Sequence, residues 1–142
     1  MTGDVNQRVA DEQAIRNVII RIATVRAFGT PEEYATLFTK DARWERPPGQ
    51  DGKPRINQIE AELAHARKNQ AAKLSGPGSH VHHVIPLIDV VLDGDRATTT
   101  SQMILLKNAD KKPEIEKMWI LKDDLVRTPQ GWRVSCRRFQ TP

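Results

Sequence analysis

The sequence predicts an α+β fold, in which three helices from the first half of the chain cover one face of an antiparallel sheet from the second half. The first observation is a run of apolar side chains at helical spacing over residues 11–27. The second is the change after residue 80 to strand-like segments separated by short turns. The clearest turns are Asp93-Gly94-Asp95 and Pro129-Gln130-Gly131, because glycine accepts the positive φ of a tight turn and proline favours a turn φ.

The composition is that of a globular chain of one domain. Its 142 residues suffice for a single core of ordinary size, and 38% of them are hydrophobic while 28% are charged. A disordered chain would be less apolar, and a membrane protein would contain longer stretches without charge. No basic segment followed by an apolar run opens the chain, so we expect no signal peptide, no membrane association and a cytoplasmic location. The single cysteine, Cys136, excludes an internal disulfide and a multi-cysteine metal site.

The net charge of +4 raises the question of a nucleic-acid partner. Lysines and arginines are scattered among carboxylates, and the only dense basic runs are Lys111-Lys112 and Arg137-Arg138. Aromatic residues are not interleaved with the basic ones, as base stacking would require. We therefore expect a mildly basic solvated surface and no nucleic-acid partner.

The first two helices have the clearest local signals. The apolar stripe of the first one, over residues 11–27, contains Ile15, Val18, Ile19, Ile22 and Val25. Thr30, Pro31 and Glu33 then supply an N-cap, a proline at the first helical position and a capping-box glutamate. We expect this second helix to bury Tyr34, Leu37 and Phe38 and to end at Lys40-Asp41.

A brief strand is expected over residues 42–47, stopped by two prolines and a glycine. The third helix is expected to bury Ile56, Ile59, Leu63 and Ala66, which leaves His65 in solvent. A loop over residues 75–79 then separates the helical half from the strands. The expected strands cover residues 80–92, 97–107, 115–127 and 132–139, with a polar loop over residues 108–113.

The densest group of functional side chains is His80, His82 and His83. On a strand, His80 and His82 share one face, but two histidines do not define a metal site and no third ligand is indicated, so we expect no metal. His83 lies on the opposite face with apolar neighbours, where a histidine acts as a general base near neutral pH or serves as a hydrogen-bonded structural residue.

A catalytic histidine commonly works with a carboxylate, and the candidates are Asp123 and Asp124. They lie on opposite faces of one strand, and apolar residues flank both, so alternation does not decide which one points inward. The remaining candidates for a ligand pocket are Trp44, Tyr34, Arg46 and Arg127. Trp44 supplies packing area, and the two arginines are either binding groups for an anion or structural side chains.

Three segments together carry a family resemblance: residues 37–44, the strand of His83 ending in the turn at residues 93–95, and residues 123–133. Over residues 11–139 the chain resembles the SnoaL-like members of the nuclear-transport-factor-2-like, or cystatin-like, superfamily. The resemblance implies three helices packed on a strongly curved antiparallel sheet, which form a cone with a small-molecule cavity. It also implies assembly into dimers or trimers through the sheet. The resemblance further implies that no cofactor is needed, and the sequence agrees in having neither a glycine-rich phosphate loop nor a convincing metal cluster.

In dehydratase-like and dehydrochlorinase-like relatives, an aspartate or tyrosine near the end of the first helix works with a strand histidine. His83 matches that histidine and Trp44 matches a pocket tryptophan. Ala27, however, stands where the aspartate belongs and Ile22 is near the tyrosine position, and residues 13–31 contain no Asp, Glu or Tyr. A dyad of that kind cannot form, whereas cyclase-like relatives can place the acid on a late strand.

Two functions are therefore expected from the sequence. The first is a cofactor-independent lyase, isomerase or cyclase that acts on a hydrophobic cyclic substrate, with His83 as base and Asp123 or Asp124 as the acid. The second is a ligand-binding or accessory protein without catalysis, which has lost the acid of the first helix. The sequence does not name the substrate.

Overall fold

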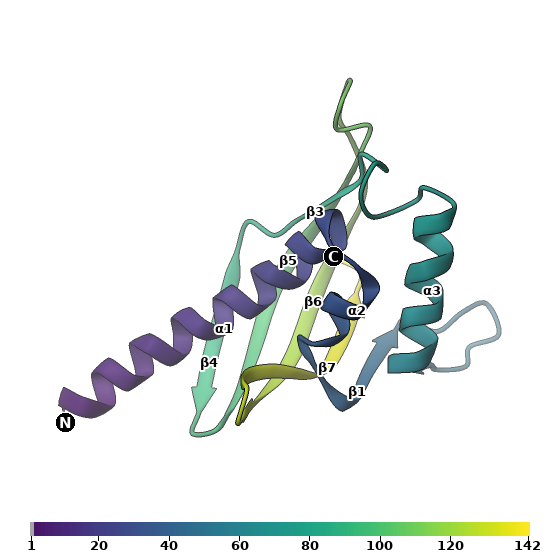
Figure 1. The fold of residues 1–142 in the computed structure, drawn as a ribbon. Coiled ribbons are helices and arrows are strands. Elements are labelled where there is room, and N and C mark those ends of the chain that lie inside the picture. The colour runs from purple at the N-terminus through teal and green to yellow at the C-terminus, as the bar shows by residue number, and fades with distance from the viewer. Residues whose placement is uncertain (1) are drawn as a thin grey trace.

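The computed structural model describes residues 2–142, and this range contains three helices (Figure 1). They are α1 (Thr2–Phe28), α2 (Pro31–Ala35) and α3 (Ile59–Ala71). The strands in the same range are β1 (Phe38–Arg46), β2 (Arg55–Gln58), β3 (His82–Val84), β4 (Ile88–Asp93), β5 (Arg96–Lys107), β6 (Glu114–Thr128) and β7 (Gly131–Gln140). The α+β class predicted from the sequence is confirmed.

The strands form one open sheet in the order β2-β1-β7-β6-β5-β3, and β4 pairs with another part of β5. The prediction of a wholly antiparallel sheet was wrong, because β1 runs parallel to its neighbour β7. No hairpin constrains these two strands, which come from the first and last thirds of the chain, so local turn signals carry no information about their direction. The remaining pairs are antiparallel.

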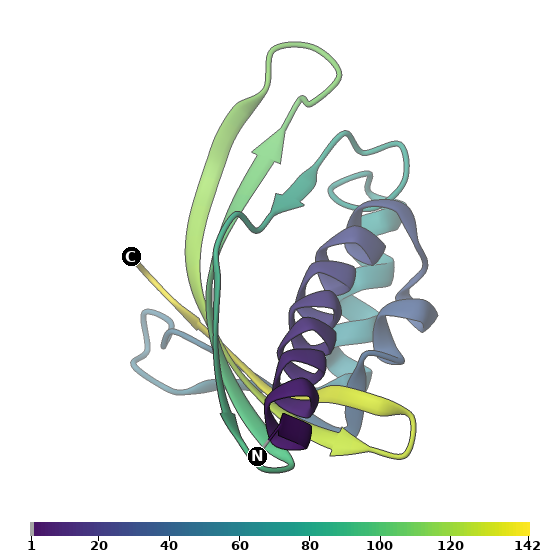
Figure 2. The same cartoon turned by 90° about the vertical axis from the view of Figure 1, so that its left-hand side faces the viewer.

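The sheet is curved, and the helices lie on its concave side (Figure 2). The long helix α1 crosses the strands, while α3 lies near α2, β1 and β2 (Figures 1 and 2). This arrangement places the end of α1 against β3, where the Phe28 ring contacts that of His82, and the candidate site forms beside it.

The first two helices begin or end at other residues than the sequence predicts. The helix α1 begins nine residues before the apolar stripe at residue 11, on a segment whose described side chains are exposed. The capping box of Thr30 and Glu33 is confirmed, but α2 ends at Ala35 instead of continuing to residue 40. The reason is tertiary, because the Leu37 carbonyl accepts a hydrogen bond from the Val134 amide, and this draws the chain into β1.

Two further expectations, both based on hydrophobic patterns, were wrong. Ile56 does not belong to the third helix, since it lies on the short strand β2 and is exposed. The expected strand over residues 80–92 is two strands, β3 and β4, interrupted at Pro86. Proline has no amide hydrogen to continue the ladder, which explains the break.

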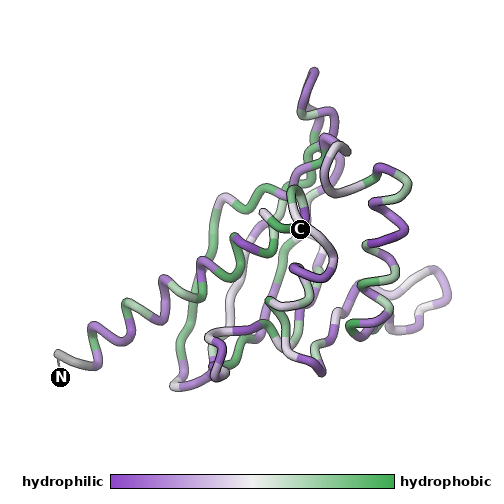
Figure 3. Tube along the Cα trace, in the orientation of Figure 1, coloured by the Kyte–Doolittle hydropathy of each residue, from purple (hydrophilic) through white to green (hydrophobic). Residues whose placement is uncertain are grey.

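The core lies between α1 and the concave face of the sheet. Ile15, Ile19 and Ile22 of α1 are fully or almost fully buried, as the apolar stripe predicts. They pack with buried residues of the sheet such as Trp44 and Val134. Hydrophobic residues recur along α1, whereas hydrophilic ones dominate the second half of α3 (Figure 3). The helix α1 is therefore the main cover of the sheet, and α3 lies at the margin.

An ion-pair cluster at Asp11 holds the first half of α1 to the hairpin of β6 and β7. Arg127 donates hydrogen bonds of 2.8 and 2.7 Å to the two carboxylate oxygens of Asp11 and one of 2.8 Å to Asp95. The Trp132 indole also donates to Asp11, at 3.2 Å. These donors, above all Arg127, lower the pKa of Asp11 to about 2.

Candidate functional site

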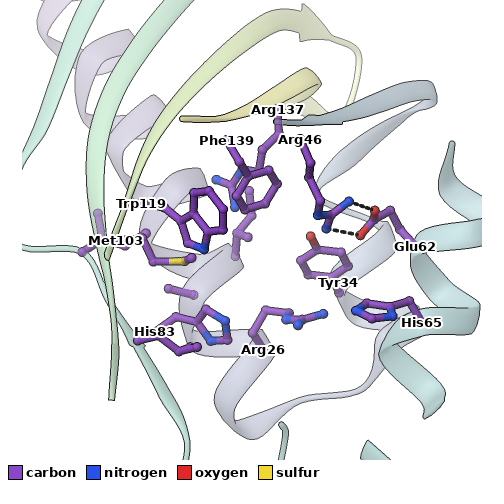
Figure 4. Close-up of a pocket in the computed structure, with 14 residues that line it drawn as sticks. Arg26, Tyr34, Arg46, Glu62, His65, His83, Met103, Trp119, Arg137 and Phe139 are labelled. Atoms are coloured by element: carbon purple, nitrogen blue, oxygen red, sulfur yellow. Dashed lines mark hydrogen bonds and ion pairs between the residues drawn. The ribbon is translucent and has the colours of Figure 1, made fainter. Parts of the chain in front are cut away.

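A pocket of about 230 Å³ opens between the end of α1, α3 and the concave face of the sheet (Figure 4). Its apolar lining residues are Ile22, Ala23, Ile85, Met103, Leu105, Trp119 and Phe139. The polar and charged lining residues are Arg26, Tyr34, Arg46, Glu62, His65, His83 and Arg137. The pocket thus combines an apolar wall with a group of cations.

The periodicity of each element explains which side chains reach the pocket. On α1, Ile22 and Arg26 are four residues apart and therefore lie on one face of the helix. On the strands, residues two apart share a face, which brings Met103 and Leu105 of β5 to the same wall. His65 of α3 also lines the pocket. Its side chain is exposed to solvent, as the sequence predicts.

His83 faces the pocket from β3 (Figure 4). Its Nδ1 atom is buried and has no hydrogen-bond partner among the described residues. Burial lowers the pKa of His83 to about 3, with further lowering by the charges of Arg26 and Arg137. The imidazole is consequently neutral at pH 7, with one ring nitrogen that holds a lone pair.

Two of the pocket arginines have carboxylate partners. Arg46 forms a two-pronged pair with the buried Glu62, which also accepts a hydrogen bond from Asn57 at 3.1 Å. Arg137 pairs with Asp123 of the neighbouring strand through hydrogen bonds of 2.8 and 2.9 Å. Both guanidinium groups are therefore fixed in orientation and neutralised in place.

Arg26 differs from them, since it forms no ion pair within the described part of the chain. Its guanidinium lies over the ring of Tyr34, 5.4 Å from the ring centroid. The Tyr34 hydroxyl accepts a hydrogen bond of 3.2 Å from the buried indole of Trp44. That contact uses an oxygen lone pair and leaves the hydroxyl hydrogen available to a ligand.

The structure places the sequence candidates in three different settings. His83, Tyr34 and Arg46 line the pocket. Trp44, which was also expected as a pocket residue, is fully buried behind Tyr34 and is not among the residues that line the pocket, so it has the packing role alone. Arg127 lies in the Asp11 cluster, outside the residues that line the pocket, and holds α1 to the hairpin.

The two aspartates are distinguished by the register of β6. Asp123 points inward with Leu121 and Leu125, and its side chain is completely buried. Asp124 points outward and pairs with Arg138 at 2.9 Å. Both Asp123 oxygens accept from Arg137, so Asp123 reaches the pocket only through that arginine, and no hydrogen bond joins it to His83 in the described structure.

Sequence reasoning missed Arg26, Glu62, Trp119 and Arg137 as pocket residues. The signal for Arg26 was available, because it lies four residues after Ile22 and thus borders the apolar stripe. The resemblance instead placed Ala27 at this point, and Ala27 is buried in the core. At the end of α1, where the resemblance implies an acid, the cation Arg26 lines the pocket.

Neither a metal site nor a membrane span emerges from the described residues. No group of three or more histidine, cysteine, aspartate or glutamate side chains in this range could hold a metal ion. None of the helices described is long and apolar enough to cross a membrane.

Comparison with known proteins places the fold in a family. The model of the SnoaL-like domain matches residues 7–138. Among solved structures, a protein with a cystatin-like fold from Novosphingobium aromaticivorans, described as NTF2-like, is similar with a TM-score of 0.77 and 16% identity, over 97% of this chain and 86% of that one. A protein of unknown function with a cystatin-like fold from Nostoc punctiforme has a TM-score of 0.73 and 15% identity, over 94% and 92% of the two chains.

The protein Aln2 from a Streptomyces species matches with a TM-score of 0.67 and 18% identity, over 96% of this chain and 91% of that one. At such identities these structures establish the fold alone. No curated protein matches the chain. The match to the family model extends over nearly the whole sequence, and we conclude that the chain belongs to the SnoaL-like domain family.

Proposed function

We propose that the chain binds an apolar, ring-containing small molecule in this pocket and moves a proton on it, as a lyase, isomerase or cyclase does. His83 is the proton acceptor. The observation that carries the proposal concerns His83, which lines the pocket and whose buried Nδ1 has no hydrogen-bond partner in the described structure. A buried polar atom without a partner is costly, and a ligand that supplies the partner offsets that cost.

The chemistry needs no external co-reactant. His83 takes a proton from a carbon next to a carbonyl group, and the electron pair of the broken C–H bond moves onto the carbonyl oxygen to form an enolate. Return of the proton to a different carbon gives an isomer, and loss of a leaving group gives elimination. The Tyr34 hydroxyl is the donor assigned to the enolate oxygen.

The other residues hold this arrangement in place. Trp44 orients the Tyr34 hydroxyl, and Glu62 orients Arg46. Asp123 is a positioning residue that acts through Arg137. Asp124 and Arg127 are outside the proposal, because their partners are Arg138 in one case and Asp11 and Asp95 in the other.

The test is hydrogen exchange of a carbon acid. The protein is incubated in D₂O with 2-tetralone, a two-ring ketone with acidic hydrogens beside the carbonyl group, and NMR follows the loss of those hydrogens. We expect the protein to accelerate exchange over buffer and the His83→Gln variant to lose this acceleration. His82→Gln is the matched control, since His82 is adjacent on β3 but does not line the pocket. Equal exchange rates for His83→Gln and the unaltered protein would refute the role of His83.

A second function, ligand binding without catalysis, has one observation in its favour. In the described structure, the carboxylate that lines the pocket, that of Glu62, is already held by Arg46 and Asn57. His83 thus has no free carboxylate beside it to stabilise its protonated form. Exchange no faster than in buffer, together with tight binding of 2-tetralone, would establish this alternative.

A further inference from the structure

We infer that the ligand of this pocket is an organic carboxylate, in which an apolar ring body carries one negative group that Arg26 binds. The inference rests on the proposed use of the pocket for a small molecule, but it requires no catalysis. The sequence predicts a hydrophobic ligand, and the inference gives this ligand a negative charge and assigns Arg26 to bind it.

The first argument is the difference between Arg26 and its neighbours. Arg46 and Arg137 each hold a carboxylate through two hydrogen bonds, whereas Arg26 has none among the described residues. Figure 4 shows the Arg26 side chain between those of His83 and His65, with its guanidinium below the Tyr34 ring. A planar guanidinium presents paired donors that match a carboxylate, so the group that is missing in the protein is the one a ligand can bring.

A structural role explains Arg26 only in part. It lies in the last turn of α1, where a cation interacts favourably with the helix dipole, and it covers the face of the Tyr34 ring. Both contacts are compatible with a guanidinium in solvent. Neither one requires the side chain to line an apolar pocket, and this is the feature that the carboxylate explains.

The charge balance of the pocket is the second argument. Three guanidinium groups, those of Arg26, Arg46 and Arg137, face the site, while two carboxylates, those of Glu62 and Asp123, compensate them. One positive charge is left over, at Arg26. A charge close to apolar walls is poorly screened, so an anion gains more here than on the open surface.

The apolar wall and the size of the pocket define the rest of the ligand. Met103, Leu105, Trp119 and Phe139 from the sheet form a surface suited to an aromatic or alicyclic ring. A volume of about 230 Å³ is close to the lower end of small-molecule sites, at ~300 Å³. A ligand of one or two rings with a carboxylate fits this description.

The same anion would act on His83. The positive charge of Arg26 is one of the causes that lower the pKa of His83, after burial. A carboxylate bound at Arg26 compensates this charge and moves the pKa of the imidazole back toward neutrality, where a general base is most effective. Ligand charge and proton transfer would thus be linked through one residue.

The experiment compares two probes of nearly equal shape, naphthalene-2-carboxylate and naphthalene-2-carboxamide. Binding to the full chain is measured by calorimetry at pH 7 and low salt, and the NMR signal of the Trp119 indole N–H in the pocket gives a second readout. We expect the carboxylate to bind roughly 10- to 100-fold more tightly than the amide, the range for hydrogen bonds to charged groups. In Arg26→Gln this preference should disappear.

Arg21→Gln is the matched control, because Arg21 is an exposed arginine of the same helix outside the pocket, and its removal should leave the preference intact. Arg26→Lys keeps the charge without the paired donors and should retain an intermediate preference, which serves as the test if Arg26→Gln folds poorly. Equal binding of the two probes, no binding of either, or a preference that survives in Arg26→Gln would each overturn the inference.

The outcome is separable from that of the proposed function. If His83→Gln loses the exchange activity but keeps the preference for the carboxylate, the result supports the role of His83 in proton transfer and leaves the inference about Arg26 unchanged. A carboxylate preference in a protein that catalyses no exchange would leave the present inference standing while the proposed reaction failed.

Discussion

Asp123 and Arg137 face each other across the β6–β7 pairing, and both oxygens of the carboxylate accept hydrogen bonds from the one guanidinium in a fully buried setting. A buried pair of this kind is costly to break, because the remaining charge has neither water nor a partner. Arg137 also lines the pocket, so this pair connects the stability of the sheet to the shape of the site.

We expect Asp123→Asn to lower the free energy of unfolding by about 3–5 kcal/mol, the range for breaking one side of a buried ion pair. Asp124→Asn should cost less than about 1 kcal/mol, because its pair with Arg138 is partly exposed and screened by solvent. Urea unfolding of both variants checks the difference. Similar losses for the two would mean that the burial of Asp123 does not determine its contribution.

The burial of His83 predicts how stability depends on pH. Its pKa is lowered to about 3 in the folded protein and is near 6.5 in the unfolded chain, so between these values the unfolded state binds more protons. Stability from this group is present above pH 6.5 and is lost as the pH falls. Between pH 7 and pH 5, we expect the free energy of unfolding of the unaltered protein to fall by about 1–2 kcal/mol more than that of His83→Gln. Urea unfolding at each pH measures this difference. Parallel pH profiles would contradict a neutral buried imidazole.

The cluster at Asp11 should tie α1 to the terminal hairpin. Asp11→Asn removes the charge that accepts two hydrogen bonds from Arg127, and we expect a loss of about 1–3 kcal/mol and faster amide exchange in the first half of α1. Glu12→Gln is the control, since its pair with Arg16 is a surface contact of 3.6 Å on the same helix. Unchanged amide exchange in Asp11→Asn would show that apolar packing alone holds the helix.

The hairpin turn gives a backbone prediction. Gly131 has φ of +108°, a conformation that strains any side chain, so Gly131→Ala should destabilise the protein by about 1 kcal/mol or more. Gly49→Ala is the comparison, because Gly49 lies in a loop without positive φ and an added Cβ would make only ordinary contacts. Thermal unfolding should show a clear loss for the first variant and almost none for the second.

The sequence predicted those features that local chemistry determines. Thr30 and Glu33 cap α2 as expected, and the turn at Gly94 joins β4 and β5. Which of Asp123 and Asp124 points inward could not be predicted, because the two lie on opposite faces of the strand and both faces carry apolar residues. The pairing of Asp123 with Arg137 across two strands breaks that symmetry.

The site was predicted in part for the same reason. His83 and Tyr34 were found from residue type and strand or helix face, and both line the pocket. Arg26 was missed because the resemblance drew attention to Ala27, and neighbouring residues on a helix point about 100° apart. Arg127 was a plausible anion-binding residue by composition, yet its partner Asp11 lies more than a hundred residues away in the chain.

The parallel pairing of β1 with β7 has a consequence for how the protein is made. Strand β1 lies early in the chain, but it joins the rest of the sheet through β7, which comes after β3, β4, β5 and β6, so β1 and β2 cannot join the sheet until β7 has been synthesised. Arg46 of β1 and Arg137 of β7 come to line the same pocket only at that stage. Loss of β7 would therefore also detach β1 and β2 from the sheet, and it would remove the pocket wall that Arg46, Arg137 and Phe139 form, so ligand binding depends on this one strand.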